Sequence, residues 1–340
     1  MSNVSERGIV MPASPIRKLI PFANKAKERG IRIIPLNIGQ PDIPTPKPIM
    51  EAMRNFDAKV LAYSPSNGEE GLLKAFSKYY ERINIKLKPE NIIVTTSGSE
   101  AIYFAMLAVC DVDDELLVFE PFYTNYEGIA VESGVKLKAV RTYPENGFHL
   151  PKKEEIEKAI THKTKGILIC NPNNPTGTVY SDKELNVLRE LVKEHDIFLI
   201  SDEVYREFVY DGQTHTSIMT LDDISDNIIL VDSVSKRYSV CGARIGLIAS
   251  YNKKIMDAVL KFAQARLSSP TIEQVGAQAG IEMDLSYFKP ILEEYEKRRN
   301  AVLDGLHKIP GVVCETPGGA FYCIAKLPID NAEKFAKWMM

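Results

Sequence analysis

Seven short apolar runs, rich in Val and Ile, constrain the fold of this chain more than any other feature of its sequence. The runs occupy residues 91–97, 115–121, 135–140, 165–171, 197–203, 227–233 and 244–250. Most of them are separated by segments with helical spacing, such as SDKELNVLRELVKEH at 181–195. Apolar strands that alternate with helices are typical of a sheet covered by helices on both faces, so we predict an α/β fold.

The pattern changes near residue 270, and this change divides the chain. Residues 286–309 have the spacing of one long amphipathic helix, and shorter extended pieces follow it. The Pro-rich stretch at 35–48 excludes regular structure and is expected to cross between two bodies. A length of 340 residues also suggests two domains. We expect an N-terminal arm and small-domain segment at 1–45, a large domain at 46–270 and a smaller α+β domain at 271–340.

Charge and composition exclude several classes of partner. The net charge is −3 with acids and bases interspersed, so neither nucleic acid nor an anionic membrane surface is indicated. The N-terminus has no apolar core of signal-peptide length, and no apolar run approaches the about 18 residues that span a bilayer. Five cysteines without close pairing fit reduced thiols rather than disulfides or a zinc site. We therefore expect a cytoplasmic protein without a metal.

Polar residues follow several of the predicted strands, where ligands bind in sheets of this kind. Ser97-Gly98-Ser99-Glu100 begins a helix whose backbone N–H groups suit a phosphate, although an ordinary N-cap is the alternative. The turn NPNNPTG, rigid because of its prolines, holds Asn171 at the end of a strand. Asp202 ends another apolar run, with Tyr205 three residues later. A helix N-cap is again the alternative for Asp202.

Lys236 and Arg244 complete this set, since they lie between the last two apolar runs. A single Lys is usually a solvated surface charge. Here, however, an amine nucleophile, an acid, phenol and amide donors and an anion cradle are expected at one sheet edge. Pyridoxal 5′-phosphate needs a Lys for its aldehyde, a carboxylate for its pyridinium nitrogen, and N–H groups with an Arg for its phosphate. The constellation predicts a site for this cofactor.

The ordered motifs of the chain resemble those of the class I and II aminotransferases, which are fold type I pyridoxal-phosphate enzymes, and among them the aspartate aminotransferase group. The resemblance extends from about Pro35 to Tyr322. Its motifs, in order, are NIGQPDIPTP, YSPSNGEEGLLKAF, TTSGSEAI, NPNNPTG, SDEVY, SVSKRYSVCGARIG and PGGAFY. The resemblance implies a mostly parallel seven-stranded sheet in a large cofactor-binding domain, a smaller α+β domain, and a homodimer with shared active sites.

The resemblance also implies roles for the residues at the strand ends. Lys236 would form the Schiff base with the cofactor and move the proton to and from the substrate α-carbon. Asp202 would keep the pyridine nitrogen protonated. Tyr205 and Asn171 would donate hydrogen bonds to the ring hydroxyl oxygen. Lys236, Asp202 and Tyr205 are therefore the expected catalytic residues, and Asn171 is also expected to contact substrate.

The remaining implied contacts concern the phosphate, the ring face and the substrate. The expected phosphate ligands are Gly98, Ser99, Ser233 and Arg244. Tyr123 would stack on the cofactor ring, with a core tyrosine as the alternative. Tyr63 would reach the phosphate of the neighbouring subunit. The backbone of Gly39 would approach the substrate carboxylate, with an ordinary turn glycine as the alternative.

The activity implied by the resemblance belongs to amino acid metabolism. An amino group would move by a ping-pong mechanism from an L-amino acid, aspartate first, to a 2-oxo acid such as 2-oxoglutarate. A carbon–sulfur β-lyase with the same cofactor residues is the alternative. A non-catalytic ligand sensor is a third hypothesis, although the first 35 residues lack the pattern of a DNA-binding domain.

Two departures from the family pattern bear on the substrate. Ser99 stands where some members carry a Lys that helps to hold a second carboxylate, so broad neutral or aromatic specificity is also expected. The family binds the substrate α-carboxylate with an Arg well after the GAFY motif, but no Arg follows Arg299 here. The sequence ends in AEKFAKWMM, within a predicted helix. We therefore expect a C-terminally truncated chain with an incomplete small domain and poor transamination at this length.

Overall fold

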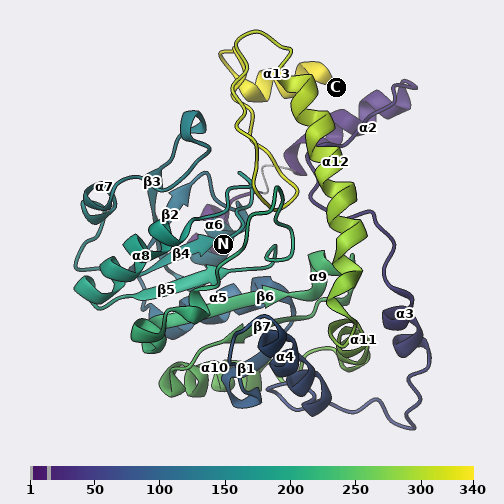
Figure 1. Cartoon of the computed structure of the whole chain (residues 1–340), viewed down its shortest axis with the longest axis vertical. Helices are drawn as coiled ribbons and strands as arrows, with labels where there is room; N and C mark the ends of the chain where they lie inside the picture. The colour runs from purple at the N-terminus through teal and green to yellow at the C-terminus, as the bar shows by residue number, and fades with distance from the viewer. Residues whose placement is uncertain (1–2, 14–16) are drawn as a thin grey trace.

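A central seven-stranded sheet organises the computed structural model, which describes residues 3–13 and 17–340 (Figure 1). The strand order is β1-β7-β6-β5-β4-β2-β3. The strands are β1 Ile92–Thr95, β2 Glu115–Glu120, β3 Lys136–Arg141, β4 Thr164–Cys170, β5 Phe198–Asp202, β6 Ile228–Ser233 and β7 Gly246–Ala249. Strand β7 is antiparallel to both of its neighbours, and the other pairs are parallel. Each predicted run forms a strand, so the predicted mostly parallel α/β sheet is confirmed.

Helices account for most of the remaining regular structure. Their bounds are α1 Glu6–Val10, α2 Ile20–Glu28, α3 Lys47–Arg54, α4 Glu70–Arg82, α5 Ser97–Val109, α6 Asn125–Ser133, α7 Lys153–Glu157, α8 Asp182–His195, α9 Val234–Arg237, α10 Lys253–Arg266, α11 Thr271–Ile281, α12 Phe288–Leu306 and α13 Ala332–Met339. No helix among the described residues is both long and apolar enough to cross a membrane.

Both faces of the inner strands are buried under helices, which explains why these strands are largely apolar, whereas the edge strand β3 is partly exposed and carries lysines. In β6, Ile228 and Leu230 pack in one core cluster with residues of α4, α8 and α11. The alternate residues Ile229 and Val231 pack in a second cluster with α5, α6 and α10. Successive side chains of a strand point to opposite faces, so neither face of β6 is left for polar groups before Asp232, the last residue but one of the strand. Polar chemistry can begin only where the strands end.

A second body lies beyond the carboxyl ends of the strands. Figure 1 shows α12 extending along one edge of the sheet from α11 to α13. Helix α12 confirms the predicted long helix, and Ile291 and Tyr295 on it pack with Tyr205 and Ala320 in a third cluster. Helix α11, which the predicted division places in the small domain, packs on α3 and α4. The boundaries at residues 45 and 270 stay a prediction.

A close backbone approach joins β7 to the start of α5. Gly246, the first residue of β7, lies against the peptide that links Ser97 to Gly98. A Cβ atom at Gly246 would lie 2.5 Å from the carbonyl carbon of Ser97 and 2.8 Å from the carbonyl oxygen of Asp232. Since backbone surrounds this position, only a residue without a side chain fits there.

The first prediction concerns this contact. Gly246→Ala should lower the free energy of unfolding by about 1 to 3 kcal/mol, because the added methyl must displace backbone rather than a side chain. Gly305→Ala on α12 is the matched control, since a Cβ there meets nothing within 4 Å. It should be neutral or stabilise by up to about 1 kcal/mol. Urea unfolding of both variants measures the difference, and equal stabilities would contradict the prediction.

Candidate active site

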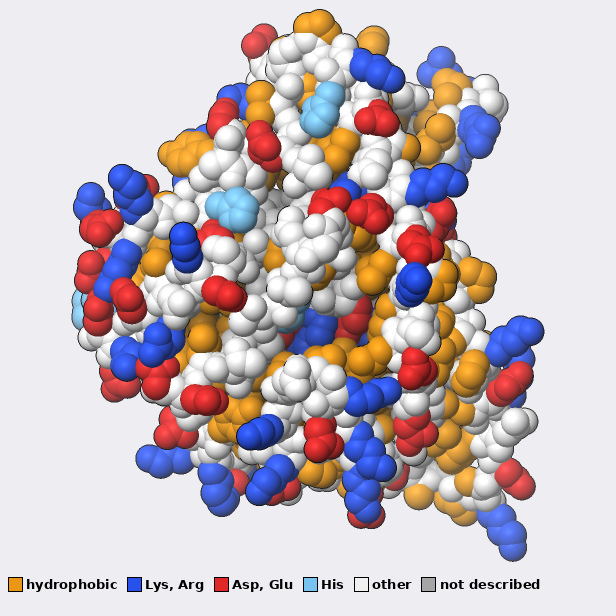
Figure 2. Space-filling model, in the orientation of Figure 1, with side chains coloured by type: hydrophobic (Ala, Val, Ile, Leu, Met, Phe, Trp, Pro, Cys, Tyr) orange, Lys and Arg blue, Asp and Glu red, His pale blue; other side chains and the backbone are white. Residues whose placement is uncertain are grey.

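Most of the sequence-predicted site residues meet in one cleft at the carboxyl ends of β5 and β6 and the start of α5. Its lining includes Gly98, Ser99, Tyr123, Asp202, Tyr205, Ser233, Lys236 and Arg244. In the same orientation as Figure 1, Figure 2 shows a hollow near the middle of this face, with both basic and acidic side chains at its bottom. The residues come from segments far apart in the sequence, and the ends of neighbouring strands bring them together.

Lys236 lies on α9, a single helical turn that follows β6 directly. Ser233 caps this turn: its hydroxyl oxygen accepts a hydrogen bond from the Ser235 backbone at 3.2 Å and donates to the Ile245 carbonyl at 2.9 Å. The Lys236 Nζ atom donates to the carbonyl oxygen of Gly39 at 2.9 Å. Gly39 therefore lies beside Lys236, and a side chain at Gly39 would overlap the ring of Tyr322.

Asp202, the last residue of β5, is 7% exposed. One carboxylate oxygen accepts a hydrogen bond from the Tyr126 hydroxyl at 2.8 Å, and the other accepts from the Val204 backbone at 3.3 Å. Burial raises the pKa of Asp202 to about 6, although the Tyr126 hydrogen bond acts in the opposite direction. Residues 204–207 form turns, so the alternative of a helix N-cap is not seen at Asp202.

Tyr205 and Asn171 border Asp202. The Tyr205 hydroxyl shares a 2.7 Å hydrogen bond with the Tyr322 hydroxyl and accepts one from Asn174 at 3.3 Å. The Asn171 side-chain oxygen accepts from the Tyr180 backbone at 3.0 Å, but its buried Nδ2 has no partner among the described residues. An unmatched buried donor costs about 1 to 3 kcal/mol, so Asn171 indicates an acceptor that a bound molecule supplies.

The start of α5 offers an anion site. Ser97 adopts a left-handed conformation with φ of 76°, and the Ser99 backbone N–H bonds to the Ser97 hydroxyl at 3.3 Å. Thr96, rather than a serine, occupies the N-cap position and makes no side-chain cap. A Cβ at Gly98 would be in ordinary contact with Ser233 at 3.7 Å, so it would fill the space between these two residues. Arg244 makes no ion pair within the described residues, which leaves its charge for an anion.

Three predicted residues, Gly39, Tyr63 and Asn171, are not among those that line the cleft. Tyr123 lines the cleft and packs edge-on against Tyr126, with ring centroids 5.4 Å apart, and burial raises its pKa. Its position in the cleft favours a ligand contact over the alternative of a core tyrosine. Tyr63 is 78% exposed and does not line the cleft of its own chain. Its role across a dimer stays a prediction.

Sequence reasoning missed Tyr126, Asn174, Ser235 and Cys241, which line this cleft, and Tyr322, which lines a neighbouring one. Tyr126 and Tyr322 bond to Asp202 and Tyr205, Asn174 bonds to Tyr205, and the Cys241 sulfur lies 3.8 Å from Lys236 Nζ. Tyr126 stands three residues after Tyr123 in the sequence, so this spacing could have identified it as a residue of the cleft. Tyr322 and Asn174 belong to the quoted motifs PGGAFY and NPNNPTG, so motif membership alone could have found them.

The predicted residues fit pyridoxal 5′-phosphate. The cleft combines a primary amine, a buried carboxylate and an anion cradle at a helix start, and its wall carries the amide of Asn174. The unmatched amide donor of Asn171 is buried next to the cleft rather than on its wall. These groups correspond to the aldehyde, the pyridine nitrogen, the ring hydroxyl and the phosphate of that cofactor.

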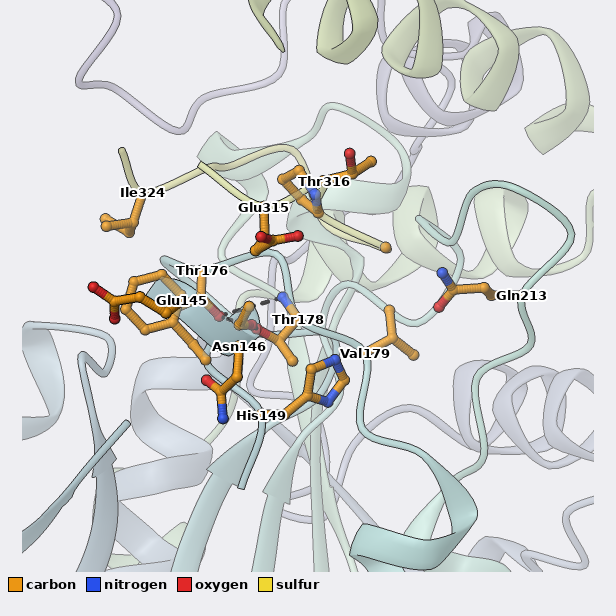
Figure 3. A pocket seen from close by; sticks show the side chains of 14 residues that line it. Glu145, Asn146, His149, Thr176, Thr178, Val179, Gln213, Glu315, Thr316 and Ile324 are labelled. Carbon is orange, nitrogen blue, oxygen red and sulfur yellow. Dashed lines mark hydrogen bonds between the residues drawn. The ribbon is translucent and has the colours of Figure 1, made fainter. Parts of the chain in front are cut away.

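A separate cleft, shown in Figure 3, lies between the turn at 145–149 and residues 315–318. Its polar groups largely satisfy one another: Thr176 bonds to Thr178 at 2.7 Å, and His149 bonds to Glu184 at 3.0 Å. None of the predicted site residues lines it. The pyridoxal-phosphate chemistry therefore belongs to the first cleft.

The second prediction follows from the burial of Asp202. An unfolded Asp has a pKa of about 3.9, so raising it to about 6 in the folded state makes the protein lose stability as the pH rises through this interval. The cofactor-free Asp202→Asn variant lacks this loss. The variant's free energy of unfolding should therefore rise relative to that of wild type, by up to about 3 kcal/mol between pH 4 and pH 7, and the difference should then stay constant.

Urea unfolding at four pH values measures this change. The exposed carboxylate of Asp257 on α10 provides the control Asp257→Asn, which removes a charge that the solvent already stabilises. A difference between Asp202→Asn and wild type that does not vary with pH would show that Asp202 ionises as easily in the folded chain as in the unfolded one.

Comparisons with known proteins agree with this site. The family model for aminotransferase class I and II matches residues 31–340. The aspartate aminotransferase of Bacillus subtilis is 36% identical over 304 residues, which cover 88% of this chain and 77% of that protein. A solved alanine aminotransferase structure from Pyrococcus furiosus has a TM-score of 0.90 at 31% identity and covers 97% of this chain and 85% of that one. An aspartate aminotransferase structure from Thermotoga maritima has the same TM-score at 32% identity, covering 97% and 87%. The chain therefore belongs to the class I and II aminotransferases, whose cofactor is pyridoxal 5′-phosphate.

Proposed function

We propose that this aminotransferase takes its amino group from aspartate and passes it to 2-oxoglutarate, with Lys236, Asp202 and Tyr205 as its catalytic residues. The observation that carries the proposal is the shared cleft, in which the Lys236 amine and the buried Asp202 carboxylate both line the wall. The names of relatives support aspartate as the donor, because those from Bacillus subtilis and Thermotoga maritima are aspartate aminotransferases. A relative from Thermococcus litoralis is named for aromatic amino acids, which keeps a broader specificity open.

Lys236 and Asp202 have different roles in the proposed reaction. When bound, pyridoxal 5′-phosphate supplies an aldehyde that takes up amino groups and a ring that withdraws electrons from the substrate α-carbon. Lys236 would hold the cofactor through Nζ, and the same atom would accept and return the proton of the substrate α-carbon. Asp202 holds a proton on the pyridine nitrogen, and a cation at that position also favours the ionised carboxylate.

Neighbouring residues orient these groups. Asn171 Nδ2 and the Tyr205 hydroxyl are the donors for the ring hydroxyl oxygen in this proposal. Tyr126 and the Val204 backbone each occupy one oxygen of Asp202, which limits the directions in which the carboxylate can turn. Gly39, whose carbonyl already accepts from Lys236, lies where a substrate carboxylate would enter. A carbon–sulfur β-lyase would use the same groups, but the relatives are named aminotransferases.

The proposal includes a cytoplasmic homodimer in which Tyr63 reaches the phosphate of the neighbouring subunit. Tyr63 stands in an exposed apolar segment with Val60, at 74% exposure, and Leu61, at 62%. Adjacent exposed apolar side chains support a protein interface there. The five cysteines are all free thiols, which supports a reducing compartment.

The third prediction tests the role of Lys236. Borohydride reduction of the wild-type protein with bound cofactor should leave the pyridoxyl group on the peptide that contains residue 236. Lys236→Ala should fold normally but retain no label and almost no transamination, since no other amine in the cleft replaces Nζ. Lys254→Ala, an exposed lysine on α10, should keep both the label and the activity. A label on a different peptide of the wild-type protein would refute the assignment.

The fourth prediction tests the donor. Single-turnover reactions with aspartate, alanine, tyrosine and cystathionine, followed by the loss of the cofactor's aldehyde absorbance, should be fastest with aspartate. Restoration of that absorbance by 2-oxoglutarate should follow, because a ping-pong mechanism returns the amino group to a second 2-oxo acid. Release of pyruvate from cystathionine, faster than any reaction with aspartate, would instead establish the β-lyase.

A further inference from the structure

A buried network of charged side chains lies behind the turn that carries Lys236, and the proposed function leaves it unused. Its members are Glu203, Arg206, Glu207, Asp232 and Arg237, with Tyr79 and Tyr80 packed among them. Arg237 is 1% exposed and forms an ion pair with Asp232. Charges are rarely buried unless they are paired, since each costs several kcal/mol to remove from water.

The pair formed by Asp232 and Arg237 is the tightest part of this network. The Arg237 Nη2 atom lies 2.5 Å from both carboxylate oxygens of Asp232. The same carboxylate accepts from the Tyr80 hydroxyl at 2.6 Å and from the Ser233 backbone N–H at 2.6 Å. The Arg237 guanidinium also lies over the Tyr79 ring, 4.9 Å from its centroid. These contacts hold Asp232 and Arg237 in place from several sides.

The location of the pair gives it a consequence for the cleft. Asp232 belongs to the end of β6, and Arg237 is the last residue of α9, so their ion pair closes the turn formed by residues 233–236. A helix of four residues is not stable by itself. Successive helical residues also point about 100° apart, so anchoring Arg237 in the interior directs Lys236 to another side. On that side Lys236 meets Gly39.

We propose that the Asp232–Arg237 pair is a positioning device that fixes Lys236 and Ser233 in the orientation required for cofactor attachment. The inference rests on the proposed role of Lys236 and deepens it. Neither Asp232 nor Arg237 lines the cleft, so both act through the turn between them. Breaking the pair leaves the turn present but allows Lys236 to take other directions.

A second buried arginine provides a matched control. Arg206 Nη2 pairs with Glu203 at 2.6 Å, and Glu203 in turn accepts from the Ser217 hydroxyl at 3.0 Å. Arg206 stacks over Tyr80, 4.7 Å from the ring centroid, and its distance to Asp232 is 3.9 Å. Arg206→Gln therefore removes a guanidinium from the same network and leaves the ion pair across residues 233–236 in place.

The fifth prediction compares Arg237→Gln, Asp232→Asn, the double variant and Arg206→Gln. The cofactor-free proteins are mixed with pyridoxal 5′-phosphate and cyanoborohydride, and mass spectrometry follows the rate at which the peptide with residue 236 is labelled. Both single variants should be labelled about tenfold more slowly or worse, because small misplacements of a reacting group have effects of this size. Their kcat should fall by a similar factor, with a smaller change in KM for the amino acid.

The double variant should recover part of the labelling rate, because the two amides can bond to each other and no unpaired charge is left at position 232 or 237. The recovery is only partial because Glu207 still loses its 3.4 Å contact with Arg237. Arg206→Gln should unfold at a lower temperature than wild type yet be labelled at close to the wild-type rate. Equal slowing in Arg206→Gln, or a wild-type rate in a folded Arg237→Gln, would overturn the proposal. If Arg237→Gln does not fold, the decision rests on Asp232→Asn, which keeps Arg237 and its contact with Glu207 and removes the carboxylate charge that pairs with Arg237. A slower rate in that variant supports the proposal, and a wild-type rate overturns it.

The labelling assay separates this inference from the proposed function because it needs no amino acid. Labelling at Lys236 without turnover of aspartate would reject the proposed donor and leave the positioning role intact. Labelling of wild-type protein at another lysine would reject the role of Lys236 and the positioning proposal together.

Discussion

Burial of both faces of the central sheet is the constraint on which the rest of the structure depends. Alternate residues of β6 enter two different core clusters, so a polar side chain within that strand would face apolar side chains in either direction. Strands that are buried on both faces can therefore carry charged groups only near their ends, as β6 does at Asp232. Asp202 and Ser233 are the last residues of β5 and β6, and Lys236 follows on the next turn. The architecture of the core thus decides the location of the cleft.

The same burial makes the polar groups of the site energetically unfavourable while no ligand is bound. The Asp202 carboxylate is enclosed with two donors, and the Asn171 amide has a donor without a partner among the described residues. Both groups are better matched by a cationic ring nitrogen and a ring oxygen than by the chain itself. The burial that makes these residues unfavourable in the free protein makes their interactions with the cofactor strong.

Local sequence patterns predicted the sheet and much of the cleft, because both depend on local rules. A run that is buried on both faces must be apolar throughout, and polar residues that end such runs, including Asp202, must lie at one edge. Contacts between distant segments could not be predicted in this way. Lys236 meets Gly39 across 197 positions, and Tyr205 meets Tyr322 across 117. No periodicity encodes such pairs, because packing of the second body against the sheet creates them.

The bond between Lys236 and Gly39 ties the reactive amine to residues 31–46, a segment without helix or strand. The Gly39 carbonyl accepts from Lys236 at 2.9 Å and from Tyr322 at 3.3 Å. An imine at Nζ would retain at most one of the three N–H donors of the ammonium group, so occupation of the cleft would compete with this hydrogen bond. By thermodynamic linkage, any change that releases residues 31–46 from Lys236 should also favour binding of the cofactor. Conversely, binding of the cofactor should favour release of these residues.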